Sequence, residues 1–171
     1  MNIVLIGYRA SGKTTVGRLL AARLGWPLRD VDRGIEAKCD LTIKDIFEQK
    51  GEPFYRDVES QVVVEMCAED RSVISFGGGT IMRPANQEHA RRDALVVYLQ
   101  AAPGELWRRI QADPDSELNR PNLSRGGFEE VVEMLEKREP TYIACADLTL
   151  DATLPPETLA QKIAESLPPP K

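Results

Sequence analysis

Residues that build metal centres and disulfide frameworks are scarce in this sequence. Among 171 residues there are one histidine, His89, and three cysteines, Cys39, Cys67 and Cys145. His89 has neither a second imidazole nor an HExxH motif around it, so the sequence predicts no zinc site. The cysteines form no CxxC pair and are odd in number, which predicts free thiols. Free thiols are typical of the cytoplasm, where we expect this protein to act.

Long apolar runs and an excess of positive charge are also missing. No segment approaches the ~18 consecutive apolar residues of a membrane span. The first apolar run, Ile3–Ile6, has no basic segment before it, so no signal peptide is predicted. The chain carries 22 basic and 27 acidic residues, a net charge of −5. We therefore expect neither nucleic acid nor a membrane as a partner, because both favour a basic surface.

What the sequence does contain is an alternation of short apolar runs and helical patterns. Its length suits one domain, and 42% hydrophobic with 29% charged residues is typical of a globular chain. Strands are predicted at residues 3–6, 28–32, 72–75, 95–99 and 148–150, with helical spacing of apolar residues between them. This pattern predicts an α/β fold with a mainly parallel sheet between helices. In such folds ligands collect beyond the carboxyl ends of the strands.

The first predicted strand runs into a sequence that fits the phosphate-binding loop, G-x-x-x-x-G-K-[ST]. The loop spans Gly7-Tyr8-Arg9-Ala10-Ser11-Gly12-Lys13-Thr14, and an amphipathic helix follows it. Glycines let successive backbone N–H groups turn towards one phosphate, and the helix N-terminus adds partial positive charge. Lys13 is predicted to reach the β- and γ-phosphates of a nucleotide, and the Thr14 hydroxyl is predicted to bind Mg²⁺.

Other motifs decide between the classes of P-loop protein. A GTPase is expected to carry D-x-x-G and N-K-x-D, which this chain lacks, and the chain is short for a motor ATPase. A small-molecule kinase remains, and it needs an acceptor site as well as cations that neutralise the phosphoryl group. A guanidinium can hold an acceptor carboxylate through two parallel hydrogen bonds. A carboxylate can orient an acceptor hydroxyl and take its proton.

Residues of these types occur as an ordered series. Asp30-Val31-Asp32 follows the second predicted strand, Phe54-Tyr55-Arg56 opens a long helix, and Gly77-Gly78-Gly79 ends the third strand. Asn119-Arg120-Pro121 and Lys137-Arg138-Glu139-Pro140-Thr141-Tyr142 come later in the chain. In this order and at these spacings, the series closely resembles the shikimate kinase family from Met1 to about Ile163.

The resemblance implies a reaction and a fold. The reaction is transfer of the γ-phosphate of ATP to shikimate, giving ADP and 3-phosphoshikimate in the aromatic amino-acid pathway. The fold is a three-layer α/β/α sandwich with a five-stranded parallel sheet, of the P-loop NTPase type and similar to nucleoside monophosphate kinases. The whole chain, residues 1–171, would form one kinase domain. It would include a shikimate-binding region at about residues 33–60 and a mobile lid at about 112–125.

The resemblance also implies roles for individual residues. Asp30 would hold Mg²⁺ with Thr14, and Asp32 would contact the shikimate hydroxyls and act as the base. Arg56 and Arg138 would grip the shikimate carboxylate, while Gly78 and Gly79 would bring backbone against the ring. Arg120 would reach the transferring phosphate, and Arg109 would lie against adenine. The predicted catalytic residues are Lys13, Asp32 and Arg120. The predicted nucleotide-binding residues are Gly7, Ala10, Ser11, Gly12, Lys13, Thr14, Thr15, Arg109 and Arg120.

Plainer alternatives stay open at this point. Asp30 and Asp32 can be turn or N-cap residues of the next helix, and Arg56 and Arg138 can be solvated charges. Arg108 competes with Arg109 for the adenine contact, and Arg9 can face solvent. Another small-acid or sugar kinase, such as a gluconate kinase, would share the phosphate loop. An ATP-binding module without turnover would need no acceptor aspartate. We expect a monomer.

Overall fold

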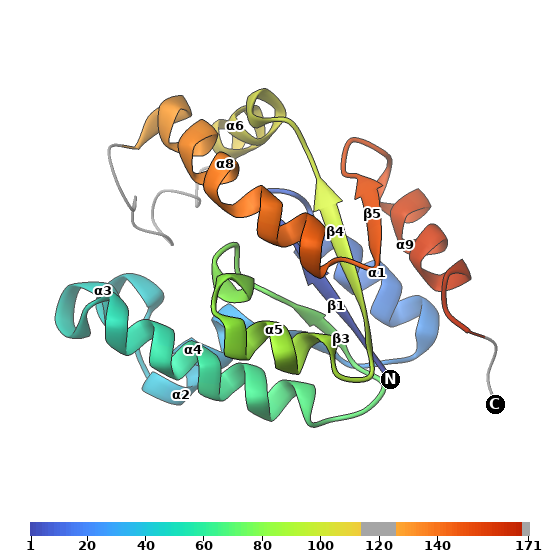
Figure 1. Ribbon diagram of the computed structural model, residues 1–171, viewed down its shortest axis with the longest axis horizontal. Helices are drawn as coiled ribbons and strands as arrows, with labels where there is room; N and C mark the ends of the chain where they lie inside the picture. The colour runs from blue at the N-terminus through green and yellow to red at the C-terminus, as the bar shows by residue number, and fades with distance from the viewer. Residues whose placement is uncertain (114–125, 169–171) are drawn as a thin grey trace.

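The computed structural model describes residues 1–113 and 126–168, and its centre is a five-stranded parallel sheet. The strand order is β2-β3-β1-β4-β5 (Figure 1). The strands are β1 (Asn2–Ile6), β2 (Leu28–Asp30), β3 (Val73–Ser75), β4 (Ala94–Gln100) and β5 (Leu148–Asp151). All four pairings between neighbouring strands are parallel. The predicted α/β class with a five-stranded parallel sheet is confirmed.

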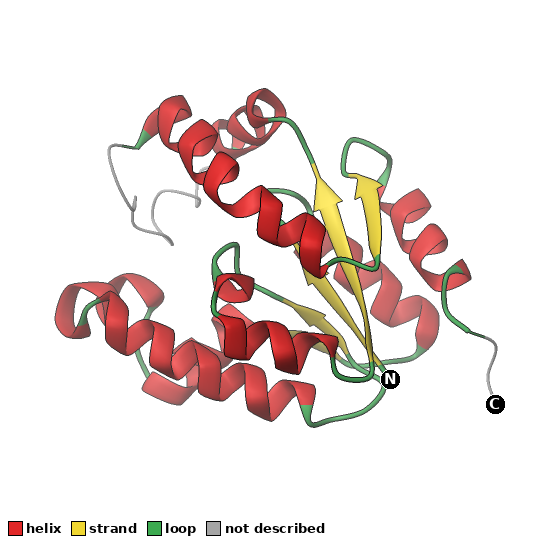
Figure 2. Cartoon of the chain, in the orientation of Figure 1, coloured by secondary structure: helices red, strands yellow, loops and turns green. Residues whose placement is uncertain are grey.

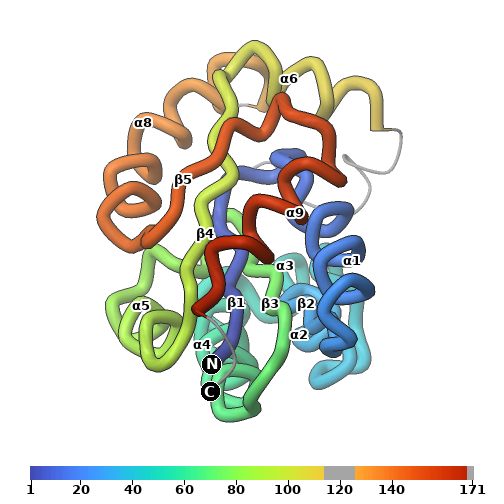
Figure 3. Tube along the Cα trace, turned by 90° about the vertical axis from the view of Figure 1, so that its right-hand side faces the viewer, coloured from blue at the N-terminus to red at the C-terminus, as the bar shows by residue number. Residues whose placement is uncertain are grey.

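Helices cover both faces of this sheet, as Figures 2 and 3 show. They are α1 (Lys13–Leu24), α2 (Val31–Cys39), α3 (Ile43–Lys50), α4 (Glu52–Cys67), the 3₁₀ helix η1 (Thr80–Met82), α5 (Pro84–Arg91), α6 (Pro103–Ala112), α8 (Gly127–Cys145) and α9 (Pro156–Glu165). In Figure 3, α1 and α9 lie on one side of the sheet, and α5 and α8 lie on the other. Every residue of β1 is buried between these layers, as expected for the central strand of a parallel sheet.

Local sequence signals account for where several elements begin and end. Helix α1 ends at Gly25, whose φ of 67° is the left-handed conformation that favours glycine. Thr42 caps α3 by accepting a hydrogen bond from the backbone N–H of Asp45. The prediction of a strand over residues 28–32 was wrong at its end. Asp30 accepts a hydrogen bond from the N–H of Arg33 at 3.1 Å, so it caps α2 and places Asp32 in a helix.

The strand register brings the carboxyl ends of the three strands β1, β2 and β3 to one edge. Ser75, the last residue of β3, pairs with Leu5 of β1 and with Asp30 of β2. The segments that leave these strands, after Ile6, Asp30 and Ser75, therefore start side by side. These segments carry the phosphate loop, the two aspartates and the glycine triplet, and the fold places them together.

The structure also bears on thiols and membranes. Cys39, Cys67 and Cys145 are free, and burial raises the pKa of the Cys67 thiol to about 11. A thiol with so high a pKa is a poor nucleophile, because the thiolate is the reactive form.

None of the helices in residues 1–113 and 126–168 has the length and apolar character needed to cross a membrane.

Candidate active site

The phosphate loop between β1 and α1 has an unusual backbone. Gly7 has a φ of 147° and Gly12 a φ of 97°, values that side chains disfavour. A Cβ at Gly7 would lie only 2.8 Å from the carbonyl oxygen of Leu99. Ala10 adopts a φ of 64° without being a glycine, which is uncommon and typical of functional loops. The loop therefore depends on the glycines that the motif supplies.

Lys13 lies inside this loop and is 7% exposed. Its Nζ donates to the carbonyl oxygens of Gly7 and Tyr8, each at 2.8 Å, and to Ser11 Oγ at 3.3 Å. The ammonium group thus holds the loop closed around the N-terminus of α1. A buried cation next to a helix N-terminus makes this loop a strong candidate for binding anionic phosphate.

A large cavity, which we call the nucleotide cavity, opens beside the loop. It is lined by six of the seven loop residues predicted to bind nucleotide, namely Ala10, Ser11, Gly12, Lys13, Thr14 and Thr15. Gly7 does not line the cavity; it supplies the carbonyl that accepts from Lys13. Arg9, which the sequence left free to face solvent, lines the cavity as well, together with Asp30 and Arg109. The structure therefore brings the predicted nucleotide-binding residues together, except Gly7 and the undescribed Arg120.

The structure separates the two adjacent arginines of α6. Arg109 donates from Nη2 to the carbonyl of Ala152 at 2.7 Å and from Nη1 to that of Ala10 at 3.3 Å. Arg108 is 67% exposed and pairs with Glu105. Both guanidinium groups donate to Glu105, Arg108 more strongly, and lower the pKa of that carboxyl to about 2. Of the two adjacent arginines, Arg109 is therefore the one that lines the nucleotide cavity.

We expect Arg109→Ala to weaken ATP binding about tenfold, because two charge-assisted hydrogen bonds that join Ala10 to Ala152 are lost. Arg108→Ala is the matched control, since Arg108 points to solvent, and it should leave the dissociation constant of ATP within about twofold of the original. Isothermal calorimetry measures both values. Equal losses in the two variants would contradict the assignment of Arg109 to the nucleotide cavity.

Two oxygen donors in this cavity fit Mg²⁺. Asp30 ends β2 and the Thr14 hydroxyl lies in the first turn of α1, and both line the nucleotide cavity. Mg²⁺ prefers oxygen ligands and is usually held by one or two protein groups with phosphates and water. Among the described residues no three carboxylate, imidazole or thiol groups gather into a protein cage. Two oxygen donors, Asp30 and Thr14, suit a metal shared with a phosphate.

A second cavity lies next to the first. The glycine triplet, the phosphate loop and helices α2, α3, α4 and α8 contribute to its lining. All five residues predicted to bind substrate line it: Asp32, Arg56, Gly78, Gly79 and Arg138. These residues are spread over more than a hundred positions of the sequence. The fold collects them into one cavity, which we call the acceptor cavity.

Each glycine of the triplet makes room for one functional side chain. A Cβ at Gly77 would lie 2.9 Å from Asp32 Oδ1. A Cβ at Gly78 would lie 3.1 Å from Nη1 of Arg138, and one at Gly79 would lie 2.7 Å from Nη2 of Arg56. Real Cβ atoms avoid such distances, so side chains here would displace the aspartate or the guanidinium groups. The triplet thus brings two arginines and an aspartate to one short stretch of backbone.

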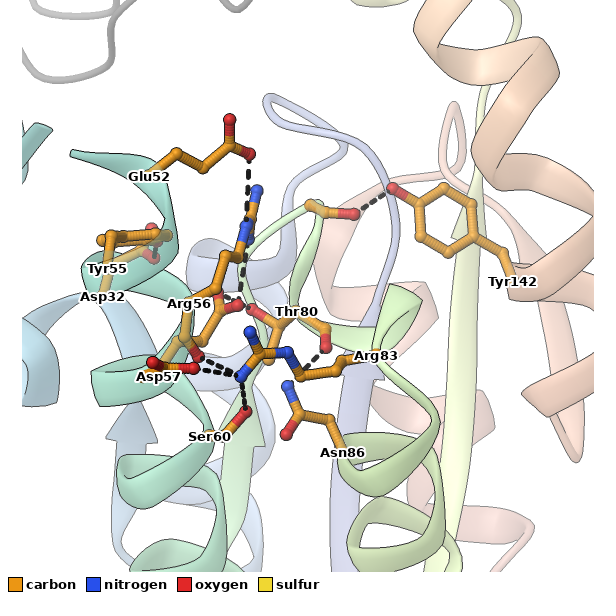
Figure 4. Close-up of polar contacts among 12 residues, drawn as sticks. Asp32, Glu52, Tyr55, Arg56, Asp57, Ser60, Thr80, Arg83, Asn86 and Tyr142 are labelled. Atoms are coloured by element: carbon orange, nitrogen blue, oxygen red, sulfur yellow. Dashed lines mark hydrogen bonds and ion pairs between the residues drawn. The ribbon is translucent and has the colours of Figure 1, made fainter.

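Arg56 is held by acidic residues of its own helix, α4, as Figure 4 shows. Its Nη1 donates to Glu59 at 2.9 Å, and its Nε lies 3.5 Å from Glu52. Glu59 is only 1% exposed and also accepts from the Thr80 hydroxyl at 2.7 Å. The buried carboxylate therefore ties Arg56 to η1, directly after the glycine triplet. Sequence reasoning missed Glu59 and Thr80, although the i, i+3 spacing of Arg56 and Glu59 was a usable signal.

Glu59→Gln is expected to lower the free energy of unfolding by about 2 kcal/mol, because the Arg56 guanidinium then loses its buried counter-charge and keeps only the exposed Glu52. Asp57→Asn is the control on the same helix. Asp57 is 69% exposed and pairs with Arg83, so its loss should cost less than about 0.5 kcal/mol. Urea denaturation measures both variants. Equal stability of the two proteins would show that Glu59 does not anchor Arg56.

Helix α8 reaches the glycine triplet through Tyr142. The Tyr142 hydroxyl, fully buried, donates to the carbonyl of Gly78 (Figure 4). The centroid of its ring lies 5.0 Å from the ring centroid of Tyr98. The Tyr98 hydroxyl in turn donates a hydrogen bond to Glu139 at 2.9 Å. These contacts fix the part of α8 that carries Arg138. They also keep the Gly78 carbonyl turned towards the helix.

Most of the predicted lid lies outside the described residues. The structure describes nothing between residues 114 and 125, and Arg120 falls in that range. Of the predicted lid, at about 112–125, only residues 112 and 113 are described, at the end of α6 and just after it. The assignment of Arg120 therefore stays a prediction from the sequence.

Comparison with known proteins points to one family. A family model described as shikimate kinase matches residues 9–168. A shikimate kinase of Dehalococcoides mccartyi is 38% identical over 149 residues, which cover 87% of this chain and 82% of that protein. One of Burkholderia thailandensis is 39% identical over 156 residues, covering 91% of this chain and 83% of that protein.

Solved structures agree as well. The shikimate kinase of Acinetobacter baumannii, solved in complex with shikimate, has a TM-score of 0.89 and 35% identity, and the match covers 96% of this chain and 90% of that one. A sugar kinase from Janibacter has a TM-score of 0.58 at 17% identity, a likeness of fold alone. On the match over residues 9–168 and these relatives, the chain belongs to the shikimate kinase family.

Proposed function

We propose that this protein transfers the γ-phosphate of ATP to the 3-hydroxyl of shikimate, giving ADP and 3-phosphoshikimate. One observation carries the proposal. The acceptor cavity contains the arginine pair predicted to bind a carboxylate, Arg56 and Arg138, together with Asp32, and it adjoins the cavity around the phosphate loop. A ring that bears both a carboxylate and hydroxyl groups suits this combination. The family to which the chain belongs supports the same acceptor.

In the proposed complex Arg56 and Arg138 bind the shikimate carboxylate. They come from different helices, α4 and α8, so two planar guanidinium groups would set both the position and the tilt of the ring. Asp32 lies beside Gly77 of the same glycine triplet. It would orient the attacking hydroxyl and take its proton late in the transfer.

The phosphate loop and α1 would bind the nucleotide. Lys13 and the backbone N–H groups of the loop would face the phosphates, and Arg109 would lie beside the adenine. Thr14 and Asp30 would hold Mg²⁺, which when bound neutralises charge between the β- and γ-phosphates. We include in this proposal the sequence prediction that Arg120, in the lid, contacts the transferring phosphate.

The predicted shikimate-binding region, at about residues 33–60, is also proposed to act as such. Five of its residues, Ile43, Phe47, Tyr55, Arg56 and Glu59, line the acceptor cavity. We further propose a single-domain monomer that acts in the cytoplasm. Both cavities are lined by one chain, and three free thiols suit a reducing compartment.

An ADP-release assay with several acceptors tests the proposal. Shikimate, quinate, gluconate and AMP are offered in parallel with ATP and Mg²⁺. We expect ADP formation to depend on shikimate and to be far slower with the other three. Release of ADP only with gluconate would favour the sugar-acid kinase alternative, and no shikimate-dependent release would reject the proposed function.

A further inference from the structure

Three residues form the boundary between the two cavities. Arg9, Asp32 and Ile43 line both the nucleotide cavity and the acceptor cavity. Asp32 is the proposed base and Ile43 is apolar. Among the described residues, Arg9 is thus the one cation that lines both cavities. A phosphoryl group that moves from one substrate to the other must cross this boundary, where its charge needs to be neutralised.

The Arg9 side chain is partly buried, and its Nε has no acceptor in the described chain. Other cations of the nucleotide cavity differ in this respect. Lys13 donates to two loop carbonyls, and Arg109 donates to Glu105. Buried donors in proteins almost always have a partner. A shielded donor without one, at the junction of two substrate cavities, indicates that a substrate supplies the acceptor.

The backbone around Arg9 is constrained on both sides. Lys13 binds the carbonyl of Tyr8 at 2.8 Å, and Ala10 has the uncommon φ of 64°. A Cβ at Gly78 would lie 3.5 Å from the backbone nitrogen of Arg9, so the glycine triplet approaches the phosphate loop at this residue. These neighbours, rather than an ion pair of its own, place Arg9 at the boundary.

From this placement we infer that Arg9 is a further catalytic residue, which binds the phosphoryl group as it passes from ATP to the acceptor. The inference rests on the proposed function. In the transfer, the shikimate oxygen forms a bond to the γ-phosphorus while the bond from that phosphorus to the β–γ bridging oxygen breaks. ADP keeps the electron pair of the broken bond, and the hydroxyl proton passes to Asp32.

The guanidinium of Arg9 donates hydrogen bonds to the phosphoryl oxygens in this step and is not itself changed. It takes part in no proton transfer, because an arginine stays protonated in proteins. Its contribution is greatest in the transition state, where neither ATP nor shikimate holds the phosphoryl group firmly. Arg9 therefore acts on kcat rather than on the binding of either substrate.

Kinetics of Arg9→Ala, Arg9→Lys and Arg18→Ala test the inference. Arg18 is an exposed cation of α1 and lines neither cavity. We expect Arg9→Ala to lower kcat with shikimate about 100-fold, the typical effect of removing one donor to a transition state. Both KM values should change by less than about threefold. Arg9→Lys keeps the charge and should regain part of the rate, and Arg18→Ala should match the original protein.

Binding of ADP and shikimate with aluminium fluoride, which mimics the phosphoryl group in transit, gives a second readout. The original protein should bind this set more tightly than ADP and shikimate alone, and Arg9→Ala should lose the difference. An unchanged kcat in Arg9→Ala, a rise in the KM of shikimate alone, or a loss of ADP binding would each overturn the role of Arg9. An original protein without shikimate-dependent ADP release would instead reject the proposed function, and this inference with it.

Discussion

Asp32→Asn is expected to lower kcat about a thousandfold while ATP still binds, an effect within the range of general base catalysis. Asp32 lies in the first turn of α2, where the Tyr55 hydroxyl donates to its Oδ1 at 3.3 Å. Asparagine keeps the shape of the side chain and an acceptor oxygen, but it cannot take the proton of the attacking hydroxyl. In the proposed complex the phosphate contacts come from the loop around Lys13, so the dissociation constant of ADP should change by less than about threefold.

Asp40→Asn is the control for this variant. Asp40 is the exposed residue that ends the same helix, with a φ of 52° that asparagine also tolerates. Steady-state kinetics give kcat for both variants, and calorimetry gives the dissociation constant of ADP. Loss of nucleotide binding in Asp32→Asn, or turnover at the original rate, would contradict the proposal that Asp32 activates the acceptor while the phosphate loop binds the nucleotide.

Gly79→Ala is expected to raise the KM for shikimate about 10- to 100-fold, the equivalent of roughly 1.5–3 kcal/mol for a lost charge-assisted hydrogen bond. The φ of Gly79 is −100°, so alanine fits the backbone without strain. Its Cβ, however, would lie 2.7 Å from Nη2 and 2.9 Å from Nη1 of Arg56. The guanidinium is the end of a flexible side chain, so it should move while the loop stays. Stability should therefore change by less than about 1 kcal/mol.

Gly104→Ala provides the matched comparison. Gly104 lies in the first turn of α6, and a Cβ there would have no other atom within 4 Å. This variant should keep the original KM for shikimate. Thermal melts of both proteins distinguish displacement of the Arg56 guanidinium, which should change stability little, from misfolding of the glycine loop, which should lower the melting temperature. If Gly79→Ala and Gly104→Ala had the same KM, the close approach of Arg56 to the triplet would have no bearing on shikimate binding.

Short-range patterns were sufficient to predict most of the fold and the nucleotide cavity. Gly7, Gly12, Lys13 and Thr14 lie within eight consecutive residues, so one segment carries the whole pattern. All five strands were predicted. Apolar runs marked β1, β3 and β4, because strands that are largely buried need such runs. The strand over residues 28–32 was predicted two residues too long, since Asp30 works both as a strand end and as the cap of α2.

The acceptor cavity was predictable only through the family resemblance. Arg56 and Arg138 each sit in a charged helical segment that is also typical of a solvated surface. Nothing local says that one glycine triplet contacts both side chains, which is a property of the folded chain. Thr80 was missed for the same reason, because its hydrogen bond to Glu59 joins α4 to η1 across 21 positions. The sequence left open whether Arg9 faces solvent, because the glycine triplet that approaches it lies about 70 positions away in the chain.

The acidic balance of the whole chain also conceals the character of its site. The net charge is −5, yet Lys13 and Arg109 line the nucleotide cavity, and Arg56 and Arg138 line the acceptor cavity. Net charge reports the surface and its long-range field. A pocket for two anionic substrates needs only the few cations that the fold brings together.

Phosphorus NMR of the reaction product tests the central claim most directly. The protein is incubated with ATP, Mg²⁺ and shikimate, and the product is compared with that from a mixture lacking shikimate. We predict one new phosphomonoester signal, coupled to the hydrogen on carbon 3 of the shikimate ring, with ADP formed in equal amount. A mixture in which ADP appears without this signal, or in which shikimate leaves the ATP unchanged, would contradict the account.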